Sequence, residues 1–231
     1  MSKPQFSLCL EASGEMASAA IFRNEQLLSS ASHRARHGHA ETLIGLAETA
    51  FDKAEVTAPE ITQIIAGCGP GSFTGLRVCL AAAQGYVLAT GAQAVGVNGL
   101  AAQACHLHAN AAMPPQLIIS CADSRAGSLF VQLFDHSVQP CSEILNIPLA
   151  DVETEMMRLI EGAQDQSVVI GGGAPETLGL NSSLSQKSVW FQLDAELVGR
   201  FVTNPRIISP VLPLEPLYII PPRLGKRSEK R

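Results

Sequence analysis

The sequence lacks the features that mark secreted, disulfide-stapled or zinc-binding chains. Its six cysteines never form a Cys-x-x-Cys pair, which is the spacing of many zinc sites and redox motifs. Most of them lie in apolar runs, so we expect buried free thiols in a reducing compartment. No apolar signal segment with a small-residue cleavage site follows Met1. We therefore expect a cytoplasmic protein whose 231 residues bury a core without disulfides or metal ions.

Charged residues are absent from one long stretch, because no Asp, Glu, Lys or Arg occurs from Val78 to Ala122. A membrane span needs about 20 predominantly apolar residues, whereas glycine, glutamine, asparagine and threonine interrupt this stretch. We expect a buried helix, strand and helix in succession. Part of their small-residue surface is expected to face a partner.

The chain also lacks the basic balance of an electrostatically driven nucleic-acid binder, since 16 Lys and Arg stand against 21 Asp and Glu, a net charge of −5. Residues 204–231 are the exception, with six basic and two acidic residues and therefore a net charge of +4. Six prolines fall between residues 205 and 222. This composition predicts an extended strap that packs through apolar residues and ends in a frayed basic tail.

What is present is a plan of strands and helices that occurs twice. The first copy predicts strands at 6–12, 16–23 and 26–32, a helix at about 39–53 and a strand at 61–68. The second copy predicts strands at 116–122, 128–134 and 138–145, a helix at about 149–161 and a strand at 168–170. A glycine-rich loop follows each copy. The repeat predicts two similar α/β lobes.

Each lobe should carry a mixed sheet, because strands of a meander pair antiparallel and strands joined through helices pair in parallel. Pro114 and Pro115 mark the expected boundary. Residues 1–112 would then form the first lobe, with the glycine-rich loop. Residues 113–231 would form the second, with the strap and the basic tail. The cleft between the lobes is the expected ligand site.

The strongest local motif is the glycine-rich loop Cys68–Arg77, which reads Cys-Gly-Pro-Gly-Ser-Phe-Thr-Gly-Leu-Arg. Ser72 or Thr74 can cap the following helix, and its first amides could bind an anion. The loop lacks the Gly-Lys-Ser/Thr ending of a Walker loop and the acidic partner of a dinucleotide fingerprint. A tight turn that only caps a packed helix is the competing interpretation. Arg77 favours a ligand, because a cation in the first helical turn opposes the macrodipole and should meet a carboxylate, a phosphate or a partner.

Two carboxylates are expected at the mouth of the cleft. Glu11 ends the first strand, and Asp123 opens the second meander beside Arg125. A phosphate or metal role would require the two carboxylates to face each other, whereas an Asp in a hairpin turn is often structural. The second glycine run could cover a nucleotide or serve only as a connector. The candidate nucleotide or anion contacts are Glu11, Gly69, Gly71, Ser72, Asp123 and Gly172.

Metal-ligating clusters have little support in the sequence. His33 and His37 stand four residues apart, but arginines lie between them and Gly38 would break a helix there. His106 and His108 have no carboxylate or cysteine pair nearby. The motifs of serine hydrolases and zinc proteases are absent. We expect no metal site.

The run Gly69 to Arg77, with the strand before it and the helix after it, closely resembles the bacterial TsaB (YeaZ) family. That family is a branch of the actin-like ATPase superfamily related to TsaD. Further matches are His39-Ala-Glu-Thr-Leu, Gly96-Val-Asn, Asp123-Ser-Arg and Glu215-Pro-Leu-Tyr. The resemblance covers nearly the whole chain. It implies a two-lobed actin-like (ASKHA, RNase H-like) fold with a shortened second lobe.

The resemblance implies a non-catalytic subunit required for making threonylcarbamoyladenosine next to the anticodon of tRNA. The chain would be a scaffold and activator of the TsaD-type transferase, which carries the metal, while TsaC makes the activated threonylcarbamoyl group. A TsaE-like ATPase would be reached through the complex. The resemblance implies no cofactor for this chain, with ATP or ADP only at the complex interface or weakly in the cleft. Contact with tRNA would be indirect, unless the basic tail reaches it.

The resemblance also implies pairing with TsaD through two helices of the first lobe, here about 39–53 and 74–89. We expect the chain to self-associate as a homodimer through the same face, because an unoccupied apolar face tends to pair with itself. The expected interface residues are His39, Leu43, Leu46, Ala47, Thr74, Arg77, Leu80 and Gln84.

Two departures bear on catalysis. Catalytic relatives place a metal-binding His-x-x-x-His shortly after the glycine-loop helix, where this chain reads Val97 to Gln103 without a histidine. The first strand ends in Leu10-Glu11-Ala12 instead of an Ile-Asp-Thr-like triplet, which weakens the case for binding ATP and magnesium unaided. A scaffold is therefore favoured. The alternative is an ATP-dependent transferase or a metallopeptidase-like enzyme in its own right.

Overall fold

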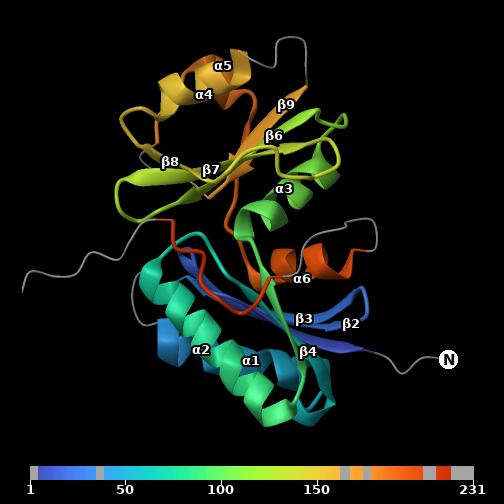
Figure 1. Cartoon of the computed structure of the whole chain (residues 1–231). Coiled ribbons are helices and arrows are strands. Elements are labelled where there is room, and N and C mark those ends of the chain that lie inside the picture. Colours follow the sequence, from blue (N-terminus) through green and yellow to red (C-terminus); the bar gives the residue numbers. More distant parts are fainter. Residues whose placement is uncertain (1–4, 35–38, 162–166, 174–177, 205–211, 220–231) are drawn as a thin grey trace, which may run out of the picture.

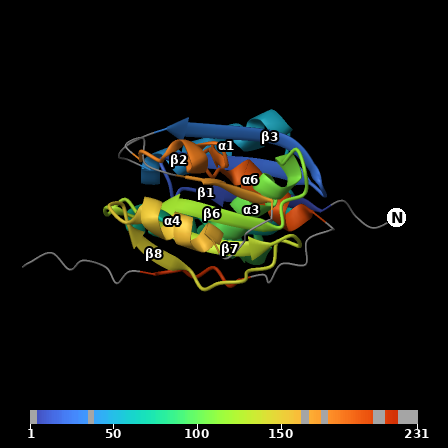
Figure 2. The same cartoon turned by 90° about the horizontal axis from the view of Figure 1, so that it is seen from above.

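Two lobes are stacked on each other in the computed structural model, which describes residues 5–34, 39–161, 167–173, 178–204 and 212–219 (Figure 1). Each lobe is built on a five-stranded mixed sheet with helices on its faces. Viewed from above, the second sheet lies over the first (Figure 2). The expected architecture of two α/β lobes is confirmed. Among the described helices, none has both the length and the apolar character needed to cross a membrane.

The first sheet has the strand order β3-β2-β1-β4-β5. Its strands are β1 (Phe6–Glu11), β2 (Met16–Arg23), β3 (Gln26–Arg34), β4 (Ile61–Gly67) and β5 (Gln93–Val97). The meander β1-β2-β3 is antiparallel, and β4 lies parallel to β1 and β5. On one face pack α1 (His39–Ala54) and α2 (Phe73–Thr90), with the short 3-10 helix η1 (Ala58–Glu60) between them in sequence. This face encloses the largest apolar cluster.

The second sheet repeats the plan in the order β8-β7-β6-β9-β10. Its strands are β6 (Leu117–Asp123), β7 (Ser128–Asp135), β8 (Leu145–Pro148), β9 (Val168–Gly172) and β10 (Ser188–Trp190). The helices α4 (Val152–Glu161) and α5 (Ser182–Ser185) cover one face, and α3 (Gly99–Asn110) covers the other. The antiparallel and parallel pairings match those of the first sheet, which confirms the duplicated plan.

One predicted strand is misplaced. The sequence predicts a strand over 138–145, but β8 covers 145–148, and the segment before it makes only an isolated bridge from Pro140 to Phe134. The Asp135 carboxylate accepts hydrogen bonds from the amides of Ser137 and Gln139. This Asx-type turn competes with strand pairing. Similarly, the first two glycines of the second glycine run belong to β9 and not to a loop.

The helices α3 and α6 cross between the expected lobes. Leu100, Ala104 and Leu107 of α3 pack on the second sheet, although α3 falls within the expected first lobe. Conversely, α6 (Ala195–Thr203) packs Val198 and Phe201 on the first sheet. A boundary between residues 112 and 113 therefore does not describe the packing. The reason is that each sheet has a second apolar face, and the chain returns from the opposite lobe to cover it.

The C-terminal strap, residues 212–219, also lies on the first lobe (Figure 1). Leu212 and Gly96 exchange backbone hydrogen bonds of 2.7 and 3.1 Å at the outer edge of β5. The Leu217 amide donates to the carbonyl of Cys68 at 2.8 Å. The strap thus covers a sheet edge that would otherwise present unpaired amides and carbonyls.

Candidate functional site

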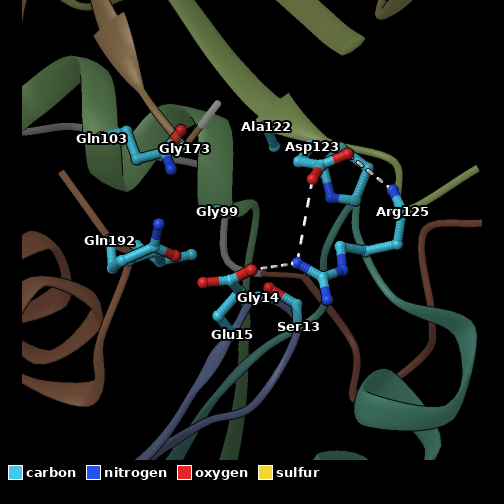
Figure 3. Close-up of a pocket in the computed structure, with 12 residues that line it drawn as sticks. Ser13, Gly14, Glu15, Gly99, Gln103, Ala122, Asp123, Arg125, Gly173 and Gln192 are labelled. Atoms are coloured by element: carbon cyan, nitrogen blue, oxygen red, sulfur yellow. Dashed lines mark hydrogen bonds and ion pairs between the residues drawn. The ribbon is translucent and has the colours of Figure 1, made fainter. Parts of the chain in front are cut away.

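The cleft between the lobes is narrow, and both charged and apolar residues line it. The β1–β2 turn supplies Ser13, Gly14 and Glu15, the second lobe supplies Asp123 and Arg125, and α3 supplies Gly99 and Gln103 (Figure 3). Its volume is about 30 Å³, which is room for only a few water molecules. Pockets that hold a nucleotide-sized ligand measure roughly 300–1,000 Å³, so a nucleotide does not fit here unless the lobes separate.

An ion-pair bridge closes this cleft. Glu15 Oε1 accepts a 2.5 Å hydrogen bond from Nη1 of Arg125, and Oε2 accepts one of 2.6 Å from Nη2 of Arg34 (Figure 3 shows the first of these). The same Nη1 of Arg125 lies 3.9 Å from Oδ2 of Asp123. The two guanidinium groups lower the pKa of the Glu15 carboxyl. Sequence reasoning missed this bridge, because nothing local in two hairpin turns indicates that they meet.

Glu11 does not lie where the sequence predicts it. Its side chain is fully buried in the first lobe and is not part of the cleft wall, so Glu11 and Asp123 do not face each other. Oε1 accepts a hydrogen bond from the Ser13 amide, and Oε2 has no hydrogen-bond partner among the described residues. Burial raises the pKa of Glu11 to about 7, an effect that the bonds from Ser13 oppose. A Cβ on Gly67 would overlap Oε2, so glycine makes the space for this carboxyl.

The glycine-rich loop packs on the β1–β2 turn. The Ser72 amide donates to the Ser13 carbonyl at 2.7 Å, and a Cβ on Gly71 would lie 2.5 Å from the same oxygen. A Cβ on Gly75 would lie 1.9 Å from the carbonyl oxygen of Ala12. Ser72 caps α2 by accepting from the Gly75 amide. At these positions the glycines allow contact with the protein's own backbone, which agrees with the turn interpretation of the motif.

Gly69 and Gly172, two other candidate anion contacts, also stand where the backbone itself favours glycine. Gly69 has φ +91°, and its carbonyl accepts from the Gly99 amide at 2.7 Å. Gly172 has φ +114°, and a Cβ there would lie 2.3 Å from the Cys121 carbonyl oxygen. Left-handed backbone of this kind favours glycine whether or not a ligand is present.

Arg77 contacts an aromatic pair of the chain itself, and no carboxylate is among its contacts in the part of the chain that the structure describes. Its guanidinium carbon lies 4.1 Å from the centroid of the Phe73 ring, and Nε donates to the Tyr218 hydroxyl at 3.2 Å. The two rings are 5.3 Å apart. A cation over an aromatic face is attracted by the ring quadrupole, so the strap supplies the partner that the sequence did not reveal.

Several of the expected interface residues are not on the surface. Leu43, Ala47 and Leu80 are buried in the first-lobe core, because α1 and α2 turn these side chains toward the sheet. Their assignment to a partner surface is wrong. Leu46 is partly buried against the same core. Thr74 is exposed, Gln84 is exposed and donates to the Leu214 carbonyl, and the side chain of His39 lies outside the described residues.

The outward surface of the two helices contains apolar and small residues that the sequence analysis did not name as interface residues. Ile44 is 41% exposed on α1 and Leu88 is 89% exposed on α2. Gly45, Ala81 and Gly85 are also exposed, and a Cβ on either glycine would meet nothing within 4 Å. The sequence did not signal their exposure, because Ile44 stands at the spacing of the apolar stripe that includes Leu43, and Leu88 is eight residues after Leu80.

No three His, Cys, Asp or Glu side chains come close enough to hold a metal ion in the part of the chain that the structure describes. His33 is exposed at the end of β3, whereas His37 falls outside the described residues. His106 stacks on Phe191, with ring centroids 4.8 Å apart. All six cysteines carry free thiols, and burial raises the pKa of Cys68 to about 11 and of Cys121 to about 12.

The model of the family described as "TsaD: tRNA N6-adenosine threonylcarbamoyltransferase" matches residues 31–160, more than half of the chain. An enzyme of that name from Streptococcus suis is 33% identical over 118 residues, which cover 44% of this chain and 35% of the enzyme. Uncharacterized proteins from Mycobacterium bovis and Mycobacterium tuberculosis are 25% identical over 172 residues, which cover 72% of this chain and 76% of theirs.

Solved structures share the fold. YeaZ from Pseudomonas aeruginosa has a TM-score of 0.66 at 17% identity, and the match covers 94% of this chain and all of YeaZ. An activator of 2-hydroxyisocaproyl-CoA dehydratase from Clostridium difficile, solved with bound ADPNP, has a TM-score of 0.52 at 11% identity, covering 87% of this chain and 96% of the activator. The chain belongs to the family of TsaD, and its actin-like fold is that of YeaZ (TsaB).

Proposed function

We propose that this chain is a non-catalytic subunit required for the threonylcarbamoyladenosine modification of tRNA, acting as scaffold and activator of a TsaD-type transferase. The observation that carries the proposal is the exposed surface of α1 and α2, here called the α1–α2 face. Its residues are Ile44, Gly45, Ala81, Gly85 and Leu88. The proposed reaction, threonylcarbamoyl transfer to tRNA, is taken from the description of the TsaD family.

The α1–α2 face has the chemistry of a protein interface. Leu88 is almost fully exposed, although removing a Leu side chain from water is worth about 1.5–3 kcal/mol. The neighbouring glycines and alanine leave room for a partner helix to approach closely. None of the five residues is charged, and charged residues are depleted at interface centres, but Glu48 is exposed one turn after Ile44 and lies close enough to α2 to act on Tyr86. Part of the remaining α2 surface is already covered, because Arg77 and Gln84 bond to the strap.

The geometry of the cleft supports a role without its own chemistry. Its volume of about 30 Å³ leaves no room for a substrate, and the Glu15 bridge ties its walls together. Glu11, the carboxylate that the sequence suggests for a metal or phosphate role, is enclosed by protein. The chain would therefore use no cofactor of its own, and ATP or ADP would bind at the complex interface or weakly in a cleft that opens.

A transferase activity of this chain is the second candidate. It is favoured by the description of the matching family, which is a transferase, and by the ADPNP bound to the activator of similar fold. This function requires the lobes to separate and the Glu15–Arg125 contact to break. A metallopeptidase-like activity has no support from the side chains described.

The proposed partners follow from the α1–α2 face. A TsaD-like protein would bind there, and a second copy of this chain would occupy the same face when the partner is absent. A TsaE-like ATPase and tRNA would be reached through the complex.

The test is co-purification with the TsaD-like protein of the same organism, followed by light scattering and by tRNA modification in the reconstituted system. The variant Leu88→Glu should prevent the complex and abolish modification. Val189→Glu is the matched control, because Val189 is 52% exposed on β10 of the other lobe. Complex formation by the Leu88 variant would refute the proposed face. Modification by this chain without its partner would establish the transferase alternative.

A further inference from the structure

A second and much larger groove lies beside the narrow cleft and is also shared by the two lobes. Its volume is about 580 Å³, against about 30 Å³ for the cleft. Ligand pockets for molecules of drug or metabolite size measure roughly 300–1,000 Å³. The groove therefore has room for a small molecule as the structure stands, without any separation of the lobes.

Both lobes contribute walls to this groove. The first lobe supplies residues 71–74, Leu76 and the end of the strap, 217–219. The second lobe supplies residues 124–128, Phe130 and two residues of β8, Asn146 and Pro148. A molecule bound here would touch both lobes at once. None of these residues belongs to the α1–α2 face, so the groove is separate from the proposed partner surface.

The first-lobe wall carries an aromatic pair held in place before any ligand arrives. The rings of Phe73 and Tyr218 are 5.3 Å apart and tilted by 32°. Arg77 fixes the pair, because it lies over the Phe73 ring and donates to the Tyr218 hydroxyl. Tyr218 is nevertheless 43% exposed. An ordered and accessible aromatic surface is suited to stacking on a planar ring.

The charge of the groove has one sign. Among the described residues that line the groove, Arg125 is the only charged one, and none is acidic. Arg125 lines the cleft as well, where its Nη1 meets Glu15. Hydroxyl and amide groups of Ser72, Thr74 and Asn146 add hydrogen-bonding capacity to otherwise apolar walls. Nη1 of Arg125 is paired with Glu15 and lies 3.9 Å from Asp123, so an anion in the groove would use the other N–H donors of the guanidinium.

We propose that this groove binds a small anionic ligand with a planar ring, the ring resting on the Phe73–Tyr218 pair and the anionic group directed to Arg125. Mononucleotides and aromatic carboxylates share this chemistry. Because the ligand contacts both lobes, its binding stabilises their present arrangement. This site differs from the narrow cleft, whose volume is too small for such a molecule.

Isothermal titration calorimetry on the whole chain tests the proposal with four probes. Adenosine 5′-monophosphate and indole-3-acetate each combine a ring with an anionic group, whereas adenosine and inorganic phosphate supply one feature alone. At least one ring-bearing anion should bind with a Kd between about 10 μM and 1 mM, at least tenfold tighter than either single-feature probe. Binding of the nucleotide alone or of the carboxylate alone identifies the source. Failure of both ring-bearing anions, or equal binding of the single-feature probes, overturns the proposal.

Paired variants place the binding in this groove. Ala126→Trp should block it, whereas Ala150→Trp, at another exposed alanine of the second lobe, should not. Tyr218→Ala should weaken binding at least tenfold, while Tyr218→Phe keeps the ring and should bind as wild type. Arg125→Gln should remove the preference for anions. Glu15→Gln is its control, because it breaks the same bridge but keeps the cation, and it should retain that preference. Binding that survives both Ala126→Trp and Tyr218→Ala would lie elsewhere and would refute the assignment.

Discussion

The two lobes share a strand order but differ in what lies at the ends of their central strands. β1 ends in Glu11 and β6 ends in Asp123, at corresponding places in the two sheets. Glu11 is fully buried, because the glycine-rich loop folds back onto the turn that follows β1. Asp123 lines the cleft. A repeated topology thus does not carry a repeated site, since the loop that follows decides whether a carboxylate meets solvent.

The helices of the lobes differ as well. The first lobe presents two long helices, α1 of 16 residues and α2 of 18 residues, on one face. The second lobe carries α4 of 10 residues and α5 of 4 residues in the same layer, and its edge strands are only 4 and 3 residues long. Among the described helices, only the first lobe has a long pair with exposed apolar and small residues, Ile44 and Leu88 among them, and Glu48 is exposed beside these. The partner surface is therefore expected there.

The largest effect should come from placing a charge at Leu80, on the inner side of α2. Leu80→Glu buries a carboxylate in the first-lobe core, which should cost on the order of 3–5 kcal/mol of unfolding free energy. Leu88→Glu, two turns further along the same helix and fully in solvent, should cost less than about 0.5 kcal/mol. Urea denaturation followed by circular dichroism measures both. Equal losses of unfolding free energy in the two variants would mean that α2 does not turn Leu80 toward the core and Leu88 toward solvent.

The pH dependence of the unfolding free energy distinguishes the buried Glu11 from the carboxylates that face solvent. Its pKa rises from 4.5 in the unfolded chain to about 7 in the fold. The folded state therefore favours the protonated form, and stability is lost as the pH rises from about 4.5 through 7. The loss should approach about 3 kcal/mol above pH 8. Glu11→Gln should remove most of this slope between pH 5 and pH 8, and an unchanged slope would contradict the assignment.

Backbone packing of the glycine-rich loop can be tested within α2 itself. Gly75→Ala places a Cβ against the Ala12 carbonyl and should destabilise the chain by about 1–3 kcal/mol. Gly85→Ala, in open space on the same helix, should stabilise it by about 0.5–1 kcal/mol. Thermal unfolding of the two variants should shift in opposite directions. A stabilising Gly75 variant would show that the loop does not rest on the β1–β2 turn.

The bridge that joins the lobes should have the smallest effect. Glu15 and Arg125 are partly exposed, so their coupling in a double-mutant cycle should be about 0.2–1 kcal/mol and should fall as salt is added. Because the pKa of Glu15 is lowered in the fold, this contribution is present above the unfolded value and is lost as the pH falls through the folded pKa. Coupling that is insensitive to salt would indicate a contact other than this ion pair.

The fold could be predicted largely from the sequence, because its strands and helices follow from local periodicity. β2 has the predicted bounds, and β1, β4 and α1 differ from prediction by one residue at one end. The bounds of α2 differ by one residue at each end from the range that the resemblance implied. The predicted strand over 138–145 was wrong because the Asp135 turn competes with pairing. For the candidate site, the sequence identified the glycine-rich loop and the two helices. It did not identify which side of each helix is exposed.

The sequence by itself determined the order of the elements, the duplicated plan and the resemblance to the TsaB family, since these depend on residues that are neighbours along the chain. The tertiary structure decided that Glu11 is enclosed, that Glu15 reaches Arg125, and that α3 and α6 each cover the sheet of the other lobe. Such contacts join residues far apart along the chain, 110 positions for Glu15 and Arg125 and 177 positions for Ser18 and Ala195. Their geometry depends on how complete layers pack, which no local pattern encodes.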